Sequence, residues 1–409
     1  MSIAYLKEEN VTLRGMDAAA SQIFLLLQQH PTISIKGIGD ELGYSSTLIK
    51  ARLHQLKEMG YLRPDREIVV PFTGLRLQTE VEADYDPRVL GLQRYNVVLS
   101  GISDMGKIRE LETFLAIYPY SHYHVPAFAT SGILFCQFDI PQGAENLLQE
   151  VLGDIRKLNY FASMRIIPQE HSVQSSFDFS KWSMRTNRWK IYQEQEFTEV
   201  SYPNEFNYLW RDFLAVRDDF PRSPLESFKV LRFDRTDLEL LRELTINAKP
   251  VITDLAQHYA ISRSRLSRRI ARIRKTIVRN ERLIYDQSLF DLTTSEIIIG
   301  KFRRGEDMNA YTLQQFLSSI PFSTTLVLHK NHYLWQVTCP PSLLPKINCF
   351  AWEHTDVQDT FLLDSELGRT YYFFHKNYDG KWKSDREYMV TRPLDTFKQV
   401  LGTSEREMT

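Results

Sequence analysis

A short stretch in the second half of the chain concentrates positive charge. Between Ser262 and Arg282 there is one acid, Glu281, against nine cations. The cations are Arg263, Arg265, Arg268, Arg269, Arg272, Arg274, Lys275, Arg279 and Arg282. Guanidinium groups bind phosphate oxygens and can also bind guanine O6 and N7 in a bidentate way. These residue types favour a nucleic-acid surface over the alternatives, which are a solvated cationic face or a site for an acidic protein.

A helical wheel divides this stretch into two sides. At about 100° per residue, Leu266, Ile270 and Ile273 fall together and are expected to face a core. The opposite side presents Ser264, Arg268, Ala271 and Lys275, with Arg265 and Arg272 flanking it. We expect Arg265 and Arg268 to reach base edges, where one bidentate contact is worth about 1–3 kcal/mol of discrimination. The expected phosphate contacts are Arg263, Arg269, Arg272, Arg279 and Arg282, and Ser262, Ser264 and Lys275 complete the predicted DNA-binding set.

Helix-start signals place this stretch in a helix-turn-helix. Asp234 can cap a first helix, Thr253 can cap a second, and Ser262 opens the third. A short break separates the first two helices, and the second and third follow one another closely, as in a DNA-binding helix-turn-helix. The apolar residues of 277–278 and 283–285 are interpreted as the two strands of a β-hairpin wing, with its turn at 279–282.

The chain contains an internal duplication. The segment from Asp17 matches the segment from Asp234 without a gap, so that Phe24 pairs with Leu241 and Ile38 with Leu255. The similarity resumes downstream, where 111–121 parallels 312–323 and 134–141 parallels 333–340. Apolar positions agree and polar ones do not, which indicates two copies of one core with different surfaces.

The first copy predicts the same helices with a different charge. Ser34 caps its second helix, Ser45 opens its third, and Leu62 and 68–70 flank a wing. The positions that match Arg265, Arg268, Arg272 and Lys275 are Leu48, Ala51, Gln55 and Glu58. Its predicted DNA contacts are Thr47, Lys50 and Arg52, and we expect this copy to touch DNA and to read bases poorly.

Each helix-turn-helix precedes the order strand, helix, strand, strand, helix, strand. In the first copy these elements are expected at 95–101, 107–117, 122–129, 133–140, 144–158 and 161–167. In the second they are expected at 296–302, 310–319, 324–329, 333–338, 343–353 and 361–363, with 371–374 extending the sheet. This βαββαβ order is typical of a ferredoxin-like antiparallel sheet with helices on one face.

The predicted fold class is therefore α+β, with two winged helix-turn-helix domains and two ferredoxin-like domains related by a pseudo-two-fold. The expected bounds are 12–75 for the first winged helix-turn-helix, 92–170 for the first ferredoxin-like domain, 171–229 for an aromatic connector with a helix after Pro203, 230–288 for the second winged helix-turn-helix, 294–376 for the second ferredoxin-like domain, and 377–409 for a C-terminal extension.

The segment FDRTDLELLRELTINAKPVITDLAQHYAISRSRLSRRIARIRK (233–275) resembles the DNA-binding domain of the Lrp/AsnC family of transcriptional regulators. The resemblance covers both copies in architecture and the second copy in motif. It implies a sequence-specific regulator of prokaryotic, archaeal type that carries the family's usual pair of units in one chain. Effector-binding members of the family have a Gly-containing turn followed by Asp between the central strands. The turns here, 130–132 and 330–331, lack the acid, which counts against an amino-acid effector.

Two other functions are compatible with the same architecture. Sirohaem decarboxylases of a haem pathway use the same units, and in such an enzyme His pairs and sheet-face arginines would bind tetrapyrrole carboxylates. An architectural DNA-binding protein with little sequence preference is the other alternative. The retained basic face of the second copy favours the regulator, so the chain is predicted not to be an enzyme.

Composition excludes several classes. The 409 residues carry 50 Lys and Arg against 51 Asp and Glu, which excludes a uniformly basic coat. No long apolar run or signal peptide is present, so a cytoplasmic, nucleoid-associated protein without membrane contact is expected. His122 and His124 alternate along a strand without further ligands, and no phosphate loop or catalytic motif occurs. We expect no metal, cofactor or catalytic residue. The expected partner is double-stranded DNA, and an effector and a homodimer are left open.

Overall fold

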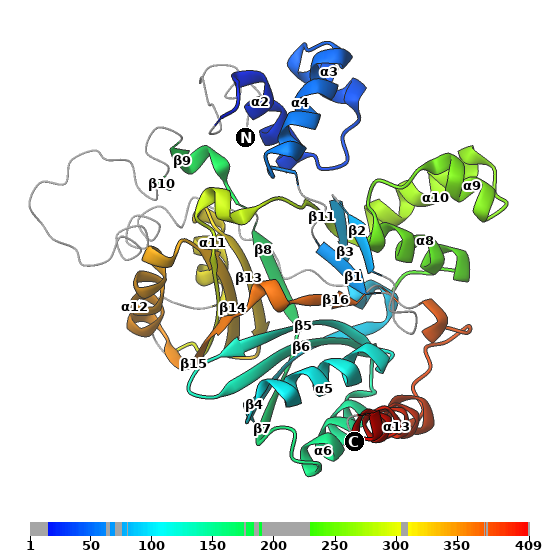
Figure 1. The fold of residues 1–409 in the computed structure, drawn as a ribbon, viewed down its shortest axis with the longest axis vertical. Helices are drawn as coiled ribbons and strands as arrows, with labels where there is room; N and C mark the ends of the chain where they lie inside the picture. Colours follow the sequence, from blue (N-terminus) through cyan, green and yellow to red (C-terminus); the bar gives the residue numbers. More distant parts are fainter. Residues whose placement is uncertain are drawn as a thin grey trace, which may run out of the picture. The chain divides into compact units, whose positions relative to one another are not determined.

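Two units, each built from both sequence copies, make up the fold. The computed structural model describes residues 15–62, 66–69, 76–79, 81–175, 177–183, 188–189, 230–303, 310–371, 373 and 375–407. One unit combines 1–21, 169–227 and 286–364, and the other combines 22–168, 228–285 and 365–409. The chain therefore crosses between the units several times (Figure 1).

The first helix-turn-helix consists of α2 (Ala18–Gln29), α3 (Ile35–Leu42) and α4 (Ser46–Glu58). Ser34 and Ser45 cap α3 and α4 as expected, because their side chains accept hydrogen bonds from the amides of Gly37 and Leu48. Phe24, Ile49 and Leu56 are fully buried in the core. The antiparallel strands β1 (Arg66–Val69) and β2 (Arg76–Thr79) follow at the predicted place of the wing.

The second helix-turn-helix consists of α8 (Arg235–Ile246), α9 (Ile252–His258) and α10 (Arg263–Thr276). Asp234 and Asp237 form a reciprocal capping box at the start of α8. Leu266, Ile270 and Ile273 are buried, as the helical wheel predicts. The predicted cap at Thr253 is wrong, because α9 begins one residue earlier, at Ile252, and Thr253 lies in its first turn.

The predicted hairpin wing at 277–285 is also wrong. The segment is one continuous strand, β11 (Val278–Leu283), which pairs antiparallel with β3 (Val81–Tyr85) of the first copy. The four residues 279–282 contain none of the glycines that tight hairpin turns favour, and β3 supplies the backbone partners instead. Arg279 and Arg282 consequently lie on this two-stranded ribbon and not at a turn.

The first ferredoxin-like sheet has the expected order of elements. These are β4 (Leu92–Ile102), α5 (Met105–Ile117), β5 (Ser121–Phe128), β6 (Gly132–Pro141), α6 (Glu145–Lys157) and β7 (Ser163–Pro168). The strands pair antiparallel in the order β7-β4-β6-β5. The C-terminal helix α13 (Arg392–Glu407) packs on α5, where the ring of Phe397 lies 5.6 Å from that of Phe114.

The second ferredoxin-like sheet repeats this arrangement within the other unit. Its elements are β12 (Thr294–Lys301), α11 (Ala310–Ser319), β13 (Ser323–His329), β14 (His332–Cys339), α12 (Leu344–His354) and β15 (Asp356–Leu363). The strands pair antiparallel in the order β15-β12-β14-β13. Both copies therefore form the predicted α+β architecture of helix-turn-helix plus ferredoxin-like sheet, and the predicted fold class is confirmed.

The two copies exchange strands. β8 (His171–Ser175) follows the first copy and pairs with β13 of the second. β16 (Arg369–Tyr371) follows the second copy and pairs with β5 and β1 of the first. The expected extension of the second sheet at 371–374 is wrong at Tyr371, which ends β16 in the sheet of the first copy, and residues 372 and 374 lie outside the described residues. The predicted helix after Pro203 lies outside the described residues.

Short elements complete the described chain. They are η1 (Pro87–Leu90), η2 (Phe179–Lys181), β9 (Trp182–Ser183), β10 (Arg188–Trp189), η4 (Gln287–Phe290), η5 (Pro341–Leu343), η6 (Ser365–Leu367), η7 (His375–Asn377) and the π-helical turn η8 (Glu387–Thr391). Within the described ranges, every helix is too short or too polar to span a membrane.

Candidate nucleic-acid interface

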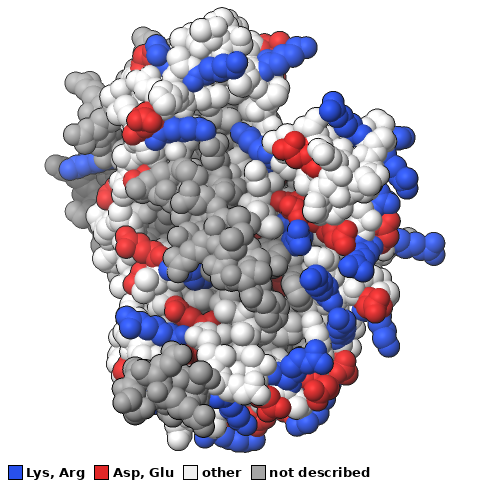
Figure 2. Space-filling view, turned by 45° about the vertical axis from the view of Figure 1, so that its right-hand side comes forward, with Lys and Arg blue, Asp and Glu red and all other residues white. Residues whose placement is uncertain are grey.

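The predicted DNA-facing side of α10 is exposed. Arg263, Arg265, Arg268 and Lys275 all have exposed side chains. In the described part of the chain, Arg263, Arg265 and Lys275 form no ion pair, and Arg268 Nε lies 3.4 Å from the Ser264 carbonyl oxygen of its own helix. Figure 2 shows Lys and Arg side chains gathered on the outer side of the α8–α10 body. Four cations are thus available to an external anion.

Two other arginines of α10 are held by α8. Arg269 Nη2 lies 2.7 Å from Asp234 Oδ2, and Arg269 Nη1 lies 3.1 Å from Asp237 Oδ1. Arg272 Nη2 donates to the other oxygen of Asp237, whose side chain is 2% exposed. The hydrogen bond from Arg269 lowers the pKa of Asp234. These side chains therefore connect α10 to α8, and the expected phosphate role of Arg269 and Arg272 stays a prediction.

The remaining predicted contacts also fall into an exposed group and a group near acids of the chain. Ser262 and Ser264 are exposed at the start of α10. Arg282 Nη2 lies 3.1 Å from Glu82 Oε1 across the β3–β11 ribbon. Burial lowers the pKa of Arg279, whose charge lies near Asp84 and Asp86. Both ribbon arginines thus lie near acids of the chain itself, and their expected phosphate contacts stay a prediction.

The matching helix of the first copy carries much less charge. Thr47 and Lys50 are exposed on α4, and Arg52 is half-buried with an intramolecular partner. Leu48 and Ala51, at the positions of Arg265 and Arg268, are half-buried and exposed. The scaffold therefore presents this face as well, but with small and apolar groups in place of guanidinium groups.

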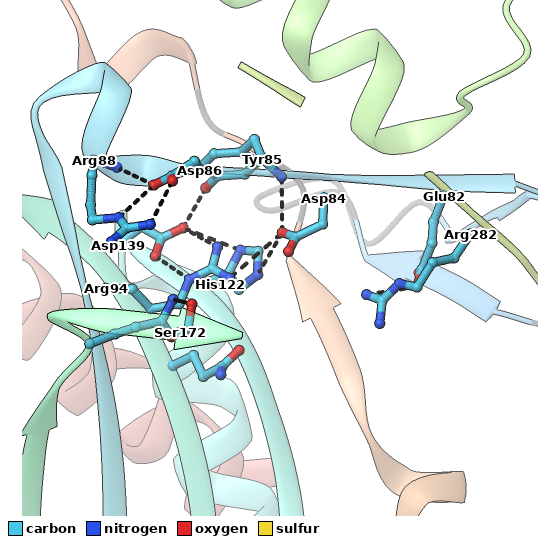
Figure 3. A network of polar contacts seen from close by, with 12 residues as sticks. Glu82, Asp84, Tyr85, Asp86, Arg88, Arg94, His122, Asp139, Ser172 and Arg282 are labelled. Atoms are coloured by element: carbon cyan, nitrogen blue, oxygen red, sulfur yellow. Dashed lines mark hydrogen bonds and ion pairs between the residues drawn. The ribbon is translucent and has the colours of Figure 1, made fainter. Parts of the chain in front are cut away.

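A buried ionic network connects the ribbon with the first ferredoxin-like sheet (Figure 3). Arg94 of β4 makes a bidentate contact with Asp139 of β6, with Nε–Oδ1 at 2.7 Å and Nη2–Oδ2 at 2.8 Å. Tyr85 of β3 donates its hydroxyl to Asp139 Oδ2 at 2.6 Å. Arg94 Nη1 also lies 3.6 Å from Asp84 Oδ1 of β3. The network therefore joins β3, the strand that follows the first helix-turn-helix (the first head; the second helix-turn-helix is the second head), to the first ferredoxin-like sheet.

His122 of β5 completes this network. Its Nδ1 lies 3.4 Å from Asp139 Oδ2 and its Nε2 lies 4.0 Å from Asp84 Oδ1. Burial lowers the pKa of His122, and the charge of Arg94 lowers it further. Burial alone would raise the pKa of Asp139, but the charge of Arg94 outweighs it and holds this pKa at about 2. Both carboxylates thus stay ionised and paired.

The histidine pair considered as a metal site is split. A bulge between Ser121 and Tyr123 turns His122 toward Asp139, whereas His124 Nδ1 lies 2.9 Å from the Tyr371 hydroxyl. His124 Nε2 lies 3.3 Å from Glu112 Oε1. Among the described residues, no three His, Cys, Asp or Glu side chains are grouped as metal ligands.

The buried network was missed in the sequence, although a signal for it exists. Arg94 and Asp139 are the single charged residues of their strands, and the βαββαβ order makes those strands neighbours. A buried charge requires a partner of opposite sign, so the two could have been paired. Asp84 carried no such signal, since its strand pairs with the other copy.

Comparisons with known proteins give one family model and several solved structures to which this chain is similar. Residues 16–63 match the family model of winged helix-turn-helix DNA-binding domains. No curated protein gives a significant sequence match. The solved structure of the sirohaem decarboxylase NirDL is 10% identical, with 95% of this chain and 99% of that chain covered and a TM-score of 0.45. AsnC of Escherichia coli is 14% identical over 38% of this chain and 93% of its own, with a TM-score of 0.27.

A regulator from Neisseria meningitidis, solved in complex with L-Met, is 14% identical over 37% of this chain and 88% of its own, with a TM-score of 0.27. At these identities no residue role carries over from any of the three. The near-full-length match to NirDL, an enzyme, contradicts the prediction that this chain is not an enzyme, and that exclusion is wrong.

The family-model match falls on the first copy, although the second has the clearer motif in its sequence. Both copies have the three helices in the same order. The chain carries a winged helix-turn-helix DNA-binding domain and is similar to regulators of the AsnC family.

Proposed function

We propose that this chain is a sequence-specific transcriptional regulator whose main DNA-reading element is α10. The observation that carries the proposal is the division of the α10 arginines into two sets. Arg269 and Arg272 are engaged by Asp234 and Asp237, while Arg265 and Arg268 project from the exposed side of the same helix. A helix held in place that exposes guanidinium groups is what major-groove recognition requires.

Each free side chain has a role in this proposal. Arg265 and Arg268 contact base edges, and a guanidinium reads guanine most effectively. Arg263 and Lys275, at the two ends of the exposed side, contact phosphates and fix the register of the helix on the duplex. Arg269 and Arg272 orient α10 through α8. In the first head, Thr47 and Lys50 contact the backbone without reading sequence.

Selection of duplexes from a random-sequence library tests the proposal. The full chain is incubated with the library, bound duplexes are enriched and sequenced, and the selected duplex is compared with random duplex by fluorescence anisotropy. We expect a recurring sequence and an affinity preference of at least about 10³ for the selected duplex. Tight binding without enrichment indicates instead an architectural protein, whose affinity falls steeply with salt and ignores sequence.

An enzyme that acts on a carboxylated tetrapyrrole is the second candidate. The observation in its favour is the presence of Arg94 and His122 together on the first sheet, since these residue types bind carboxylates. A substrate carboxylate would have to replace Asp84 or Asp139 as their partner. Titration of the chain with sirohaem, followed by absorbance, tests this candidate: a saturable spectral change that Arg94→Gln abolishes supports it, and an unchanged spectrum removes it.

A small-molecule effector and a homodimer remain predictions. An amino acid is the first effector to test, because the Neisseria meningitidis regulator was solved with L-Met. The selected duplex supplies the assay: an effector that changes the equilibrium affinity for DNA must itself bind more tightly or more weakly when DNA is present.

A further inference from the structure

The segment around η7 is folded against the entry to α8. The ring of Tyr378 lies 5.1 Å from that of Phe233, which directly precedes the α8 cap, and 5.1 Å from that of Trp382. Trp382 Nε1 donates to the Leu90 carbonyl oxygen at 2.7 Å. The aromatic contacts therefore attach this C-terminal segment to the same body that carries α8 and α10.

Buried hydrogen bonds hold the segment in one conformation. Asn377 is 3% exposed, its Nδ2 donates to the Pro119 carbonyl oxygen at 2.6 Å, and its Oδ1 accepts from the Tyr388 hydroxyl at 2.7 Å. The Lys383 amide donates to the Asn377 carbonyl oxygen at 2.9 Å. Gly380 has a φ of 73° in the turn between them, a conformation that favours glycine. The turn is thus built by specific contacts.

This segment and the residue before Phe233 carry exposed cations without ion pairs among the described residues. Arg232, Lys376 and Lys381 have exposed side chains, and none of them forms an ion pair within the described ranges. We refer to these three residues as the flanking basic surface. Asp379 is the acid of the same turn, so the surface has a net positive charge. Figure 1 shows the segment beneath α8, and Figure 2 shows Lys and Arg side chains, with acidic ones among them, below the α8–α10 body.

Other cations of the region differ because they are already engaged. Arg386 Nη2 lies 2.6 Å from Glu150 Oε1, and Arg235 Nε lies 3.0 Å from Glu239 Oε1. Lys383 Nζ donates to the Lys376 carbonyl oxygen at 3.0 Å and lies 5.2 Å from the centre of the Tyr388 ring. The flanking basic surface differs from these cations because no described acid pairs with it.

We propose that the flanking basic surface binds the phosphates of the DNA beside the groove that α10 enters. This inference rests on the proposed function, since it concerns the same duplex. Cations beside a reading helix can contact phosphates, and such contacts position the protein without reading sequence. The surface thus extends the footprint of the second head beyond the helix-turn-helix.

The test is a triple variant, Arg232→Gln/Lys376→Gln/Lys381→Gln, titrated with the selected duplex and with random duplex at several salt concentrations. Each lost phosphate contact lowers the slope of log K against log salt by about 0.9, so we expect a decrease of about 2–3. Affinity should fall about 10- to 100-fold at ~0.1 M salt, equally for both duplexes. The matched control is Arg109→Gln/Arg156→Gln/Lys398→Gln, which removes three exposed cations from α5, α6 and α13.

The outcomes separate the two proposals. Three results together support the flanking contact. The triple variant weakens binding of both duplexes, the control variant binds as the unmodified chain does, and Arg232→Lys/Lys376→Arg/Lys381→Arg keeps the original salt slope. A triple variant that behaves like the control overturns it and leaves the proposed function intact. A loss confined to the selected duplex overturns the phosphate role, because that result means base reading. No binding of DNA by the unmodified chain overturns the proposed function, and this inference with it.

Discussion

The two heads share a core and differ in what they expose. Ile49 and Leu56 of α4 are as deeply buried as Leu266 and Ile273 of α10, so the same packing holds both third helices. On the outer side, Leu48 and Ala51 stand where α10 carries Arg265 and Arg268. Burial constrains apolar positions, whereas the solvent side is free to change. The comparison teaches that one helix-turn-helix core can carry two different surfaces, and the proposed function assigns base reading to the second of them.

The largest expected effect is the loss of base reading from the second head. Replacing Arg265 and Arg268 together, Arg265→Ala/Arg268→Ala, removes two guanidinium contacts and should reduce discrimination between selected and random duplex by about 2–6 kcal/mol. Competition anisotropy with both duplexes measures this loss. Thr47→Ala/Lys50→Ala is the matched pair in the first head. A comparable loss of discrimination in that variant would contradict the proposal that only the second head reads bases.

The two sheets offer a second comparison. Glu296 of β12 occupies the place of Tyr95 in β4, and burial raises its pKa to about 7, against the hydrogen bond from Asn348. The folded state therefore binds a proton that the unfolded chain releases near pH 4.5, so stability present below that pH is lost as the pH rises to about 7.

The expected loss from this single group is about 3 kcal/mol over that range. Chemical unfolding as a function of pH measures it. Glu296→Gln should remove this component and be more stable than the unmodified chain above pH 7. The exposed Glu366→Gln is the control and should leave the pH profile unchanged. A Glu296→Gln profile with the original slope contradicts the assignment.

Removal of the ion pairs between Asp237 of α8 and the arginines of α10 is expected to have the next largest effect. Asp237→Ala eliminates the acceptor of Arg269 and Arg272 and half of the capping box, which should cost about 2 kcal/mol of unfolding free energy. The same variant should weaken DNA binding, since α10 loses its orientation. Thermal unfolding and anisotropy together check this, with the exposed Asp40→Ala of the first head as control. Unchanged stability would mean that these ion pairs do not stabilise the packing of α10 on α8.

The smallest expected effect is a gain in DNA affinity when arginines are added to the first head. Leu48→Arg/Ala51→Arg introduces the guanidinium groups of α10 at the matching positions of α4, where the side chains are half-buried and exposed. We expect affinity for random duplex to increase about 10-fold, because added cations recover phosphate contacts. Leu48→Gln/Ala51→Gln controls for shape. If the arginine pair binds no better than the glutamine pair, the first head does not face DNA.

Local patterns in the sequence were sufficient for most of the helices and for the order of strands. The spacing of Leu266, Ile270 and Ile273 predicts the buried side of α10, and Ser34 and Ser45 predict two helix starts. These signals act within one or two turns of chain. The exchange of β8 and β16 between copies was missed, because strand pairing over such distances in sequence has no local signature.

The candidate site was found through its charge but not through its partners. The density of arginine in 262–282 predicts a binding face, and Arg265 and Arg268 remain its proposed readers. The pairing of Arg269 and Arg272 with α8 has no local signal, since Asp237 precedes them by 32 and 35 residues. The spacing of Asp234 and Asp237 does signal a capping box at the start of α8, but not the pairing of these acids with α10.

One titration tests the central claim most directly. Arg268→Ala and Lys50→Ala are compared with the unmodified chain on the same selected duplex at one fixed salt concentration. The proposed asymmetry predicts a loss of about 10-fold or more for Arg268→Ala and only a small loss for Lys50→Ala. Equal losses would contradict it and would mean that both heads hold the duplex in the same way.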